Sequence, residues 1–186
     1  MKEAKKRGLT NINDVPEALD AYVSKKSIDL FKRQGVLTEV ELHARTEVKY
    51  EMFIKKLQIE SRVLGDLVQN HIVPIAIKYQ TSLLDNVKGL KEVFGDPEYE
   101  KMASAHKEMI VTISDHISGI NRLVYLMIEE RKKANVIEDS YRKALQYEKK
   151  VKPYLDQIRV HIDKLELIVD DEIWPLPKYR ELLFTR

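Results

Sequence analysis

The sequence predicts an all-α protein, an elongated antiparallel bundle of three to four long helices that are kinked at prolines. Apolar residues recur at helical spacing through long stretches, no stretch carries the signal of a strand, and the connections between the long stretches are short. Long amphipathic helices joined by short loops pack as antiparallel neighbours. Short helices precede the predicted bundle, and a tail rich in proline and aromatic residues follows it.

The longest predicted helix begins at Thr38 and ends near Phe94. Thr38 and Glu41 have the spacing of a capping box, in which the hydroxyl accepts from a first-turn amide and the carboxylate reaches back. Pro74 has no N–H to donate and its ring clashes with the preceding turn, so we expect a kink or a break near His71. Without a break, the helix would span on the order of 80 Å and the domain would be elongated. Its apolar stripe contains Phe53, Leu57, Leu64, Leu67, Val68, Ile72, Ile75, Ala76, Tyr79, Leu83 and Leu90.

Two further long helices complete the predicted bundle. The first starts at Asp96-Pro97-Glu98, with an acidic cap and a proline in the first turn, and ends near Asn135. Asp139 caps the second, which runs to about Asp170 and contains Pro153, where we expect another kink. Residues at the bundle seam repeat every seven positions in four rows: His106, Ile113, Ile120, Met127; Ile110, Ile117, Val124; Ala144, Val151, Ile158, Leu165; and Leu155, Ile162, Val169.

The N-terminal part is expected to be built from short helices. Basic residues from Lys2 to Arg7, followed by Gly8, are typical of the last turns of a helix. Pro16 suits the first position of a short helix, and Gly35 ends a second one. The predicted divisions are 1–14 as a linker, 15–36 as short helices, 37–173 as the long-helix bundle and 174–186 as a docking tail.

Composition excludes several classes of protein. The chain has 186 residues, enough for one domain with a sizeable core. Its 32 Lys and Arg residues nearly balance 30 Asp and Glu residues, so we expect neither nucleic acid nor a membrane as its partner. Without cysteine it can hold no disulfide, zinc–thiolate site or cysteine nucleophile. No apolar run reaches the roughly 18 residues that span a bilayer, and the N-terminus lacks a signal-peptide core, so we expect a cytoplasmic protein.

No motif in the sequence predicts catalysis. The glycines form neither a dinucleotide-binding fingerprint nor a Walker loop, and no nucleophile elbow occurs. No histidine follows an acidic residue by three positions, and no two histidines lie three or four apart, so we expect no metal site. We therefore name no catalytic, cofactor-binding or metal-ligating residue.

His71 and His106 are expected to lie as hydrogen-bonded polar residues at the bundle seam. The acidic run Asp170, Asp171 and Glu172 is interpreted as a hydrated turn or as partners of Lys178 or Arg180.

The C-terminal tail carries the candidate contact residues. An apolar terminus left in water is unfavourable by about 25 cal/mol per Å² of apolar area. The tail should therefore dock on its own domain or on a neighbouring subunit or domain, and the sequence leaves both options open. The docking candidates are Trp174, Pro175, Leu176, Pro177, Tyr179, Leu182, Leu183 and Phe184.

Three stretches of the chain resemble the C-terminal region of type III glutamine synthetases. They are PEALDAYVSKKSIDLF, ELHARTEVKYEMFIKKLQIESRVLGDLVQNHIVPIAIKYQ and, most specifically, DDEIWPLPKYRELLF. The stretch KEAKKRGL resembles the join to the catalytic domain upstream, so residues 1–14 are expected to be the end of that domain or a linker. The resemblance implies a parent enzyme that condenses glutamate with ammonia, uses ATP and magnesium, and forms a large double-ring homo-oligomer. No residue here matches that family's metal or nucleotide motifs, so we expect no cofactor in this segment.

Two main hypotheses for function follow. The first is a non-catalytic C-terminal helical domain of a glutamate–ammonia ligase, in contact with its own upstream catalytic domain and with neighbouring subunits. In that case the parent is an enzyme and this segment alone is not. The alternative is a free-standing helical-bundle scaffold or interaction protein. A third and weaker reading is a bundle enzyme with a buried carboxylate or histidine site. The helix-ending residues at the N-terminus favour the first hypothesis, because a free-standing protein should begin with a cap or a disordered arm.

Overall fold

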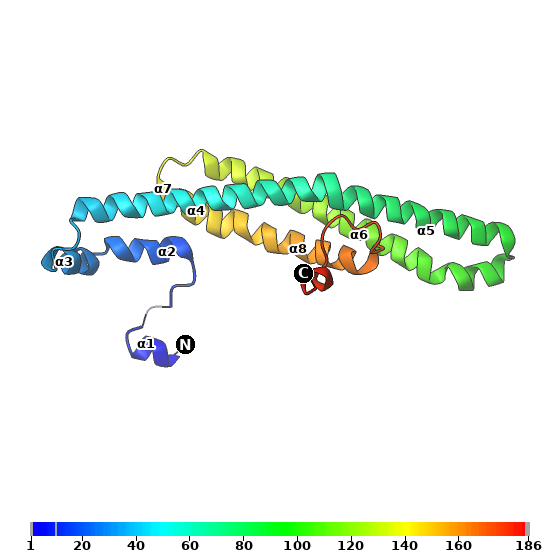
Figure 1. Ribbon diagram of the computed structural model, residues 1–186, viewed down its shortest axis with the longest axis horizontal. Coiled ribbons are helices and arrows are strands. Elements are labelled where there is room, and N and C mark those ends of the chain that lie inside the picture. The colour runs from blue at the N-terminus through cyan, green and yellow to red at the C-terminus, as the bar shows by residue number, and fades with distance from the viewer. Residues whose placement is uncertain (1, 10, 185–186) are drawn as a thin grey trace. The chain divides into compact units, whose positions relative to one another are not determined.

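The computed structural model describes residues 2–9 and 11–184, and all the regular structure in these two ranges is helical (Figure 1). This confirms the predicted all-α bundle. Nine α-helices are present among the described residues: α1 Lys2–Lys6, α2 Val15–Asp20, α3 Lys25–Arg33, α4 Glu39–Leu67, α5 Val73–Val93, α6 Asp96–Asn135, α7 Ser140–Gln146, α8 Lys152–Ile168 and α9 Tyr179–Leu182. A short 3₁₀ turn, Ala21–Val23, follows α2, and π turns Val68–Ile72 and Tyr147–Val151 join α4 to α5 and α7 to α8.

The chain divides into two compact units, and the long helices pass from one to the other. Unit 1 contains Met1–Ser61 and Met127–Pro153, and unit 2 contains Arg62–Leu126 and Tyr154–Arg186. The division cuts α4, α6 and α8, so each unit contains parts of the same long helices. Each unit has its own set of buried apolar side chains.

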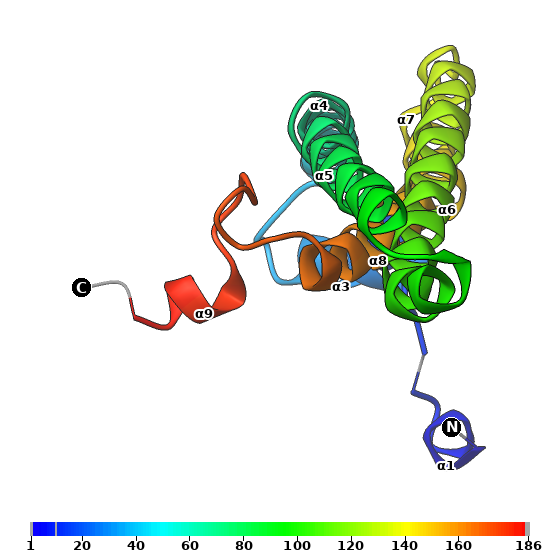
Figure 2. The same ribbon diagram turned by 90° about the vertical axis from the view of Figure 1, so that its right-hand side faces the viewer.

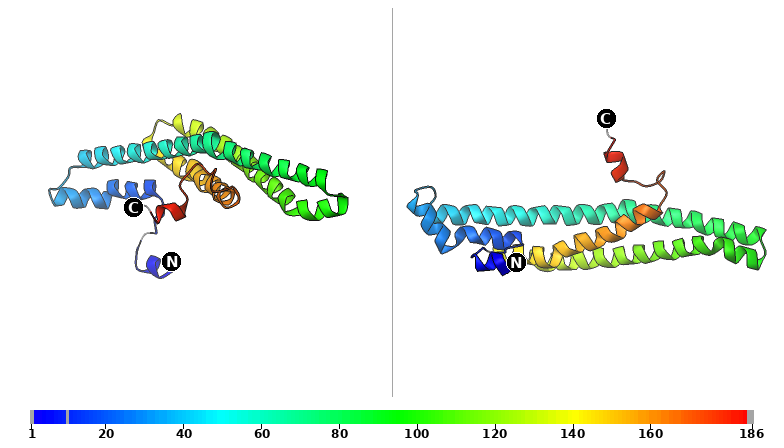
Figure 3. Two further views of the ribbon diagram at one scale, coloured as in Figure 1. Left: turned by 45° about the vertical axis from the view of Figure 1, so that its right-hand side comes forward. Right: turned by 90° about the horizontal axis from the view of Figure 1, so that it is seen from below.

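The helices of unit 1 begin and end where the sequence predicts. Gly8 and Gly35 have positive φ angles of 74° and 65°, a backbone conformation that glycine adopts without strain at helix ends. The carboxylate of Asp14 accepts from the Glu17 amide at 2.8 Å and caps α2, with Pro16 in the first turn. α2 and α3 lie alongside the first part of α4 (Figure 3).

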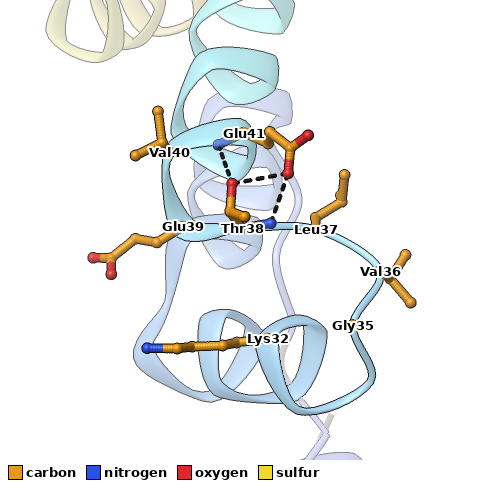
Figure 4. A pocket seen from close by; sticks show the side chains of 8 residues that line it. All are labelled: Lys32, Gly35, Val36, Leu37, Thr38, Glu39, Val40 and Glu41. Atoms are coloured by element: carbon orange, nitrogen blue, oxygen red, sulfur yellow. Dashed lines mark hydrogen bonds between the residues drawn. The ribbon is translucent and has the colours of Figure 1, made fainter.

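The predicted capping box starts α4. The Thr38 amide and hydroxyl both donate to the Glu41 carboxylate at 2.8 Å, and the Glu41 amide donates to the Thr38 hydroxyl at 3.3 Å (Figure 4). These hydrogen bonds lower the pKa of Glu41 below its ordinary value. Asp139 caps α7 as predicted, since its carboxylate accepts from the Arg142 amide at 2.7 Å.

A polar network borders the apolar core of unit 1, where the buried Tyr147 meets the half-buried Gln58 and the exposed Asn135. The Tyr147 hydroxyl donates to the Asn135 side-chain oxygen at 2.6 Å, and the Gln58 amide donates to both groups. The Tyr147 ring can therefore be fully buried while its hydroxyl keeps hydrogen-bond partners at the edge of the core. This core contains Leu42, Tyr50, Ile54, Leu57, Met127, Ala134, Ala144, Tyr147 and Val151.

In unit 2, α5 and the first part of α6 form an antiparallel hairpin through Phe94 and Gly95 (Figure 1). The Gln80 amide donates to the Ile110 carbonyl at 2.8 Å and so bridges the two helices. The predicted seam rows supply the core, because Ile113, Ile120, Ile158 and Leu165 have no exposed surface. Burying such a side chain contributes on the order of 2 kcal/mol. The rest of this core contains Val68, Ile72, Val73, Ala76, Leu83, Ala103, Leu123, Val124 and Ile162.

Neither internal proline breaks its helix. The irregularity predicted near His71 is present, but it is a π turn, in which the Val73 amide bonds to the Val68 carbonyl five residues earlier. The second π turn ends in the same way, with the Lys152 amide bonded to the Tyr147 carbonyl. A proline follows each of these amides directly. The wider turn therefore accommodates a residue that cannot donate, and the backbone continues as helix.

Candidate functional site

The inner part of the predicted docking tail is fastened to unit 2. Trp174 is only 9% exposed, and its amide donates to the Asp170 carbonyl at 3.1 Å just after the end of α8. The Asp170 carboxylate accepts from the Glu172 amide at 3.0 Å, so this acid stabilises the turn that leads to the tryptophan. For Trp174, docking takes place on its own unit.

Lys178, at the end of the inner tail, bonds back to α8 and to the acidic turn. Its ammonium donates to the Glu166 carbonyl at 2.8 Å near the end of α8, and it pairs with the Asp171 carboxylate. It also lies 5.8 Å from the centre of the Trp174 ring. Of the acidic run that we interpreted as a hydrated turn or as partners of Lys178 or Arg180, Asp171 pairs with Lys178, and the side chain of Arg180 lies outside the described residues. Asp170 and Asp171 thus take part in the turn that leads from α8 to the inner tail.

The outer part of the tail stands away from the helices of unit 2. Figure 2 shows α9 apart from α5, α6 and α8. Leu183 and Phe184 are 60% and 77% exposed, and Leu182 is 58% exposed. Pro175 and Pro177 are also exposed, Leu176 is half-buried, and the side chain of Tyr179 lies outside the described residues. Contact of these residues with a partner stays a prediction.

Two open hollows lined by described residues of unit 1 lie near the start of α4. The larger, of about 500 Å³, is mostly apolar, with two cations at Arg45 and Lys49. The Lys49 ammonium lies 4.1 Å from the centre of the Tyr22 ring, so it covers part of the apolar lining. The smaller, of about 370 Å³, lies between the end of α3 and the capping box (Figure 4). Both expose aliphatic side chains that a second protein surface could cover, among them Val40, Val48 and Met52.

A pair of histidines in unit 2 was missed by the sequence reasoning. His116 of α6 and His161 of α8 face each other with their Nδ1 atoms 2.9 Å apart, and both rings are partly buried. The rings meet edge to face at 69°, with centroids 5.2 Å apart. Burial and the neighbouring His161 lower the pKa of His116 below its ordinary value.

The other two histidines expected at the seam do not fit that expectation. His71 is exposed, because the π turn rotates it away from the stripe formed by Val68 and Ile72. His106 is half-buried, and its Nδ1 has no hydrogen-bond partner among the described residues. Across residues 2–9 and 11–184, no three His, Asp or Glu side chains come together as a metal site would require.

Comparison with known proteins identifies the family. The family model described as "Glutamine synthetase C-terminal domain" matches residues 1–91. A glutamine synthetase of Bacteroides fragilis is 54% identical over 185 residues, which is 100% of this chain. The chain belongs to the glutamine synthetase C-terminal domain family. This confirms the resemblance that the tail and the long helix predict.

Two more distant relatives match the glutamine synthetase domain over nearly its whole length. A type-3 glutamine synthetase of Dictyostelium discoideum is 31% identical over 189 residues, covering 98% of the chain. A glutamine synthetase of Butyrivibrio fibrisolvens is 25% identical over 186 residues, covering 100% of the chain. The chain spans about a quarter of the length of these relatives, 25% of the first two and 26% of the third.

The described helices were also compared with the requirements for crossing a membrane. None of them, in residues 2–9 or 11–184, combines the length and the apolar character that a membrane crossing requires.

Proposed function

We propose that this domain is the C-terminal part of a longer glutamine synthetase and that it serves assembly or contact between subunits. The observation that carries the proposal is the extent of the match. Identity of 54% runs through the whole chain, yet it covers only 25% of the Bacteroides fragilis protein. The other three quarters of such an enzyme would hold the catalytic machinery.

The parent reaction would be the ATP-dependent ligation of ammonia to glutamate, which gives glutamine. ATP and magnesium would bind in the catalytic part of the longer chain. Magnesium prefers carboxylate and water oxygens in an octahedral arrangement. In this domain the acidic turn is already engaged, since Asp171 pairs with Lys178 and Asp170 accepts from a backbone amide. We therefore assign no step of the reaction to these residues.

A contact role is supported by the apolar side chains that the domain leaves exposed. Leu183 and Phe184 extend beyond the fastened inner tail, and the hollow near Met52 and Val48 offers a second apolar surface. The proposed partners are the catalytic part of the same chain and neighbouring subunits in a double-ring homo-oligomer. Covering such surfaces contributes about 25 cal/mol per Å² of apolar area.

The first experiment measures the size of the native protein in its source cells. The protein is detected by an antibody raised against this domain. We expect a band much larger than 21.8 kDa that co-fractionates with ATP-dependent glutamine formation. A band near 21.8 kDa would overturn the proposal and favour the free-standing scaffold.

A second experiment separates assembly from catalysis in the longer enzyme. The double variant Leu183→Ser/Phe184→Ser is compared with Val160→Ser, which changes an exposed residue of α8 that is 58% exposed. We expect the tail variant to form smaller assemblies and the control to keep the full size. If both assemble fully but the tail variant loses turnover per assembled subunit, the non-catalytic role is wrong.

A further inference from the structure

The contact between His116 and His161 joins α6 to α8 in unit 2. The Nδ1 atoms are 2.9 Å apart while the ring centroids are 5.2 Å apart. That separation is close to the largest that two imidazoles can have at this nitrogen distance. The two Nδ1 atoms therefore point at each other, as in an N–H···N hydrogen bond.

The geometry limits how many protons the pair can hold. In the neutral pair one ring donates from Nδ1 and the other accepts at Nδ1, because a neutral imidazole has one donor and one acceptor nitrogen. A first added proton can bind the outer nitrogen of the donor ring and leave the bond intact. A second would have to bind the accepting Nδ1, which would place two N–H groups against each other. The doubly charged pair is therefore incompatible with this contact.

The surroundings leave room for the His161 ring and act on the charge of His116. A Cβ atom at Gly119 of α6 would lie 2.6 Å from Cε1 of His161, so only glycine leaves room for the ring here. Asp115 of α6 favours the charged form of His116, whereas Lys164 and His161 of α8 disfavour it. The nearby charges thus come from both helices, and burial adds to those that oppose protonation.

We propose that His116 and His161 form a proton-sensitive latch that holds α8 against α6 at the base of the C-terminal tail. The latch is closed while one ring is neutral, and it opens when both rings are charged. α8 ends at Ile168, and the inner tail with Trp174 is fastened directly after it. Opening the latch would therefore loosen the segment on which the outer tail is held. This inference concerns the domain itself and stands whether or not the longer enzyme assembles as proposed.

The test is a pH titration of the 186-residue chain followed by histidine NMR signals and by amide hydrogen exchange of α8. We expect the pair to titrate in two steps, with the second at least one pH unit below the first. After correction for intrinsic rates, exchange in α8 and in the inner tail should rise about tenfold for each unit that the pH falls toward the second step. Two independent titrations at ordinary histidine values, or unchanged α8 exchange, would overturn the latch.

The matched variant is His161→Asn. The control is His43→Asn, because His43 is exposed on α4. An asparagine amide can occupy the place of Nδ1 and can accept from His116 in either charge state. We expect His161→Asn to fold, judged by the emission of Trp174, and to lose the acid-induced rise in α8 exchange. The reciprocal His116→Asn should behave in the same way, and His43→Asn should keep the wild-type response. If the rise persists in both variants of the pair, it comes from other groups and the latch is wrong.

Discussion

The two halves of the C-terminal tail both contain aromatic and apolar residues, but they differ in how far those side chains are buried. The inner half has a tryptophan followed by Pro175 and Pro177, and its ring is buried while the Lys178 ammonium donates to the Glu166 carbonyl. The outer half ends in Leu183 and Phe184, which are mostly exposed. Hydrophobicity alone thus does not decide which residues dock on their own unit.

The difference lies in the polar groups that accompany each half. Around Trp174, a turn supplies backbone and carboxylate acceptors from Asp170 and Asp171 for the amides and for one ammonium. Those hydrogen bonds fix the backbone, so the ring can be buried without leaving polar groups unsatisfied. The outer half continues as one short helix, Tyr179–Leu182, beyond this anchor. The inner half, from Trp174 to Lys178, is therefore called the mount here, and we propose that the outer half is the surface presented to a partner.

The largest effect is expected at the mount. Trp174→Ala should lower the free energy of unfolding by about 3 kcal/mol, because truncating a buried aromatic ring leaves a cavity. Phe184→Ala should change it by less than about 0.5 kcal/mol, as exposed substitutions usually do. Urea unfolding followed by circular dichroism measures both. Equal losses in the two variants would contradict the division of the tail.

The next effect tests the contact between α6 and α8, the helix that the mount follows. Gly119→Ala places a methyl group 2.6 Å from the His161 ring and should cost about 1–3 kcal/mol through overpacking. Gly89→Ala of α5 meets no atom within 4 Å and should stabilise by up to about 1 kcal/mol through helix propensity. Thermal unfolding of the two variants gives opposite signs if the ring contact is present. The same sign in both would argue against it.

A smaller loss is expected at the lysine of the mount. Lys178→Met removes the donor to the Glu166 carbonyl and to Asp171 and should cost about 1 kcal/mol. The control Lys88→Met breaks an exposed pair with Asp85 at 3.1 Å and should stay within about 0.5 kcal/mol. Chemical denaturation compares the two. A control that costs as much as Lys178→Met would show that the mount adds nothing beyond surface charge.

The pH dependence follows from the lowered pKa of His116. The folded chain binds fewer protons at this group than the unfolded chain, whose value is the ordinary one of about 6.5. The contribution of His116 is fully present above that value and is lost as the pH falls from it toward the lower folded pKa. Unfolding measured at several pH values should show this loss in the wild type and not in His116→Asn. A wild-type curve that rises toward acid would contradict the sign.

The sequence predicts the local signals of this fold well. Helix caps depend only on neighbouring residues, and the structure confirms those predicted at Thr38 with Glu41 and at Asp139. Burial along a helix follows the helical period, and the structure confirms it for the row Ala144, Val151, Ile158 and Leu165. Pro74 predicts where the helix is irregular, but the choice of a π turn over a break depends on packing around Ile72. The burial of Trp174 could not be predicted, because it depends on acceptors that the tertiary turn creates.

The histidine pair shows what a different reading of the sequence could have found. His116 and His161 lie 45 residues apart, so a search for metal-ligand spacing does not connect them. Each lies three residues after one fully buried seam residue and four before the next: Ile113 and Ile120 for the first, Ile158 and Leu165 for the second. They thus share one position of the seven-residue repeat on two helices. Comparing polar residues by that position would have predicted their contact.

The smallest effect on folding should come from Leu183→Ser/Phe184→Ser. This variant tests whether the outer tail serves assembly of the longer enzyme. Its free energy of unfolding should match that of the wild-type domain within about 0.5 kcal/mol, since both side chains are mostly exposed. The decisive measurement is the mass of the assembled longer enzyme, by sedimentation, with and without these substitutions. We expect a smaller assembly for the variant, and an assembly of unchanged mass would show that Leu183 and Phe184 make no contact needed for assembly.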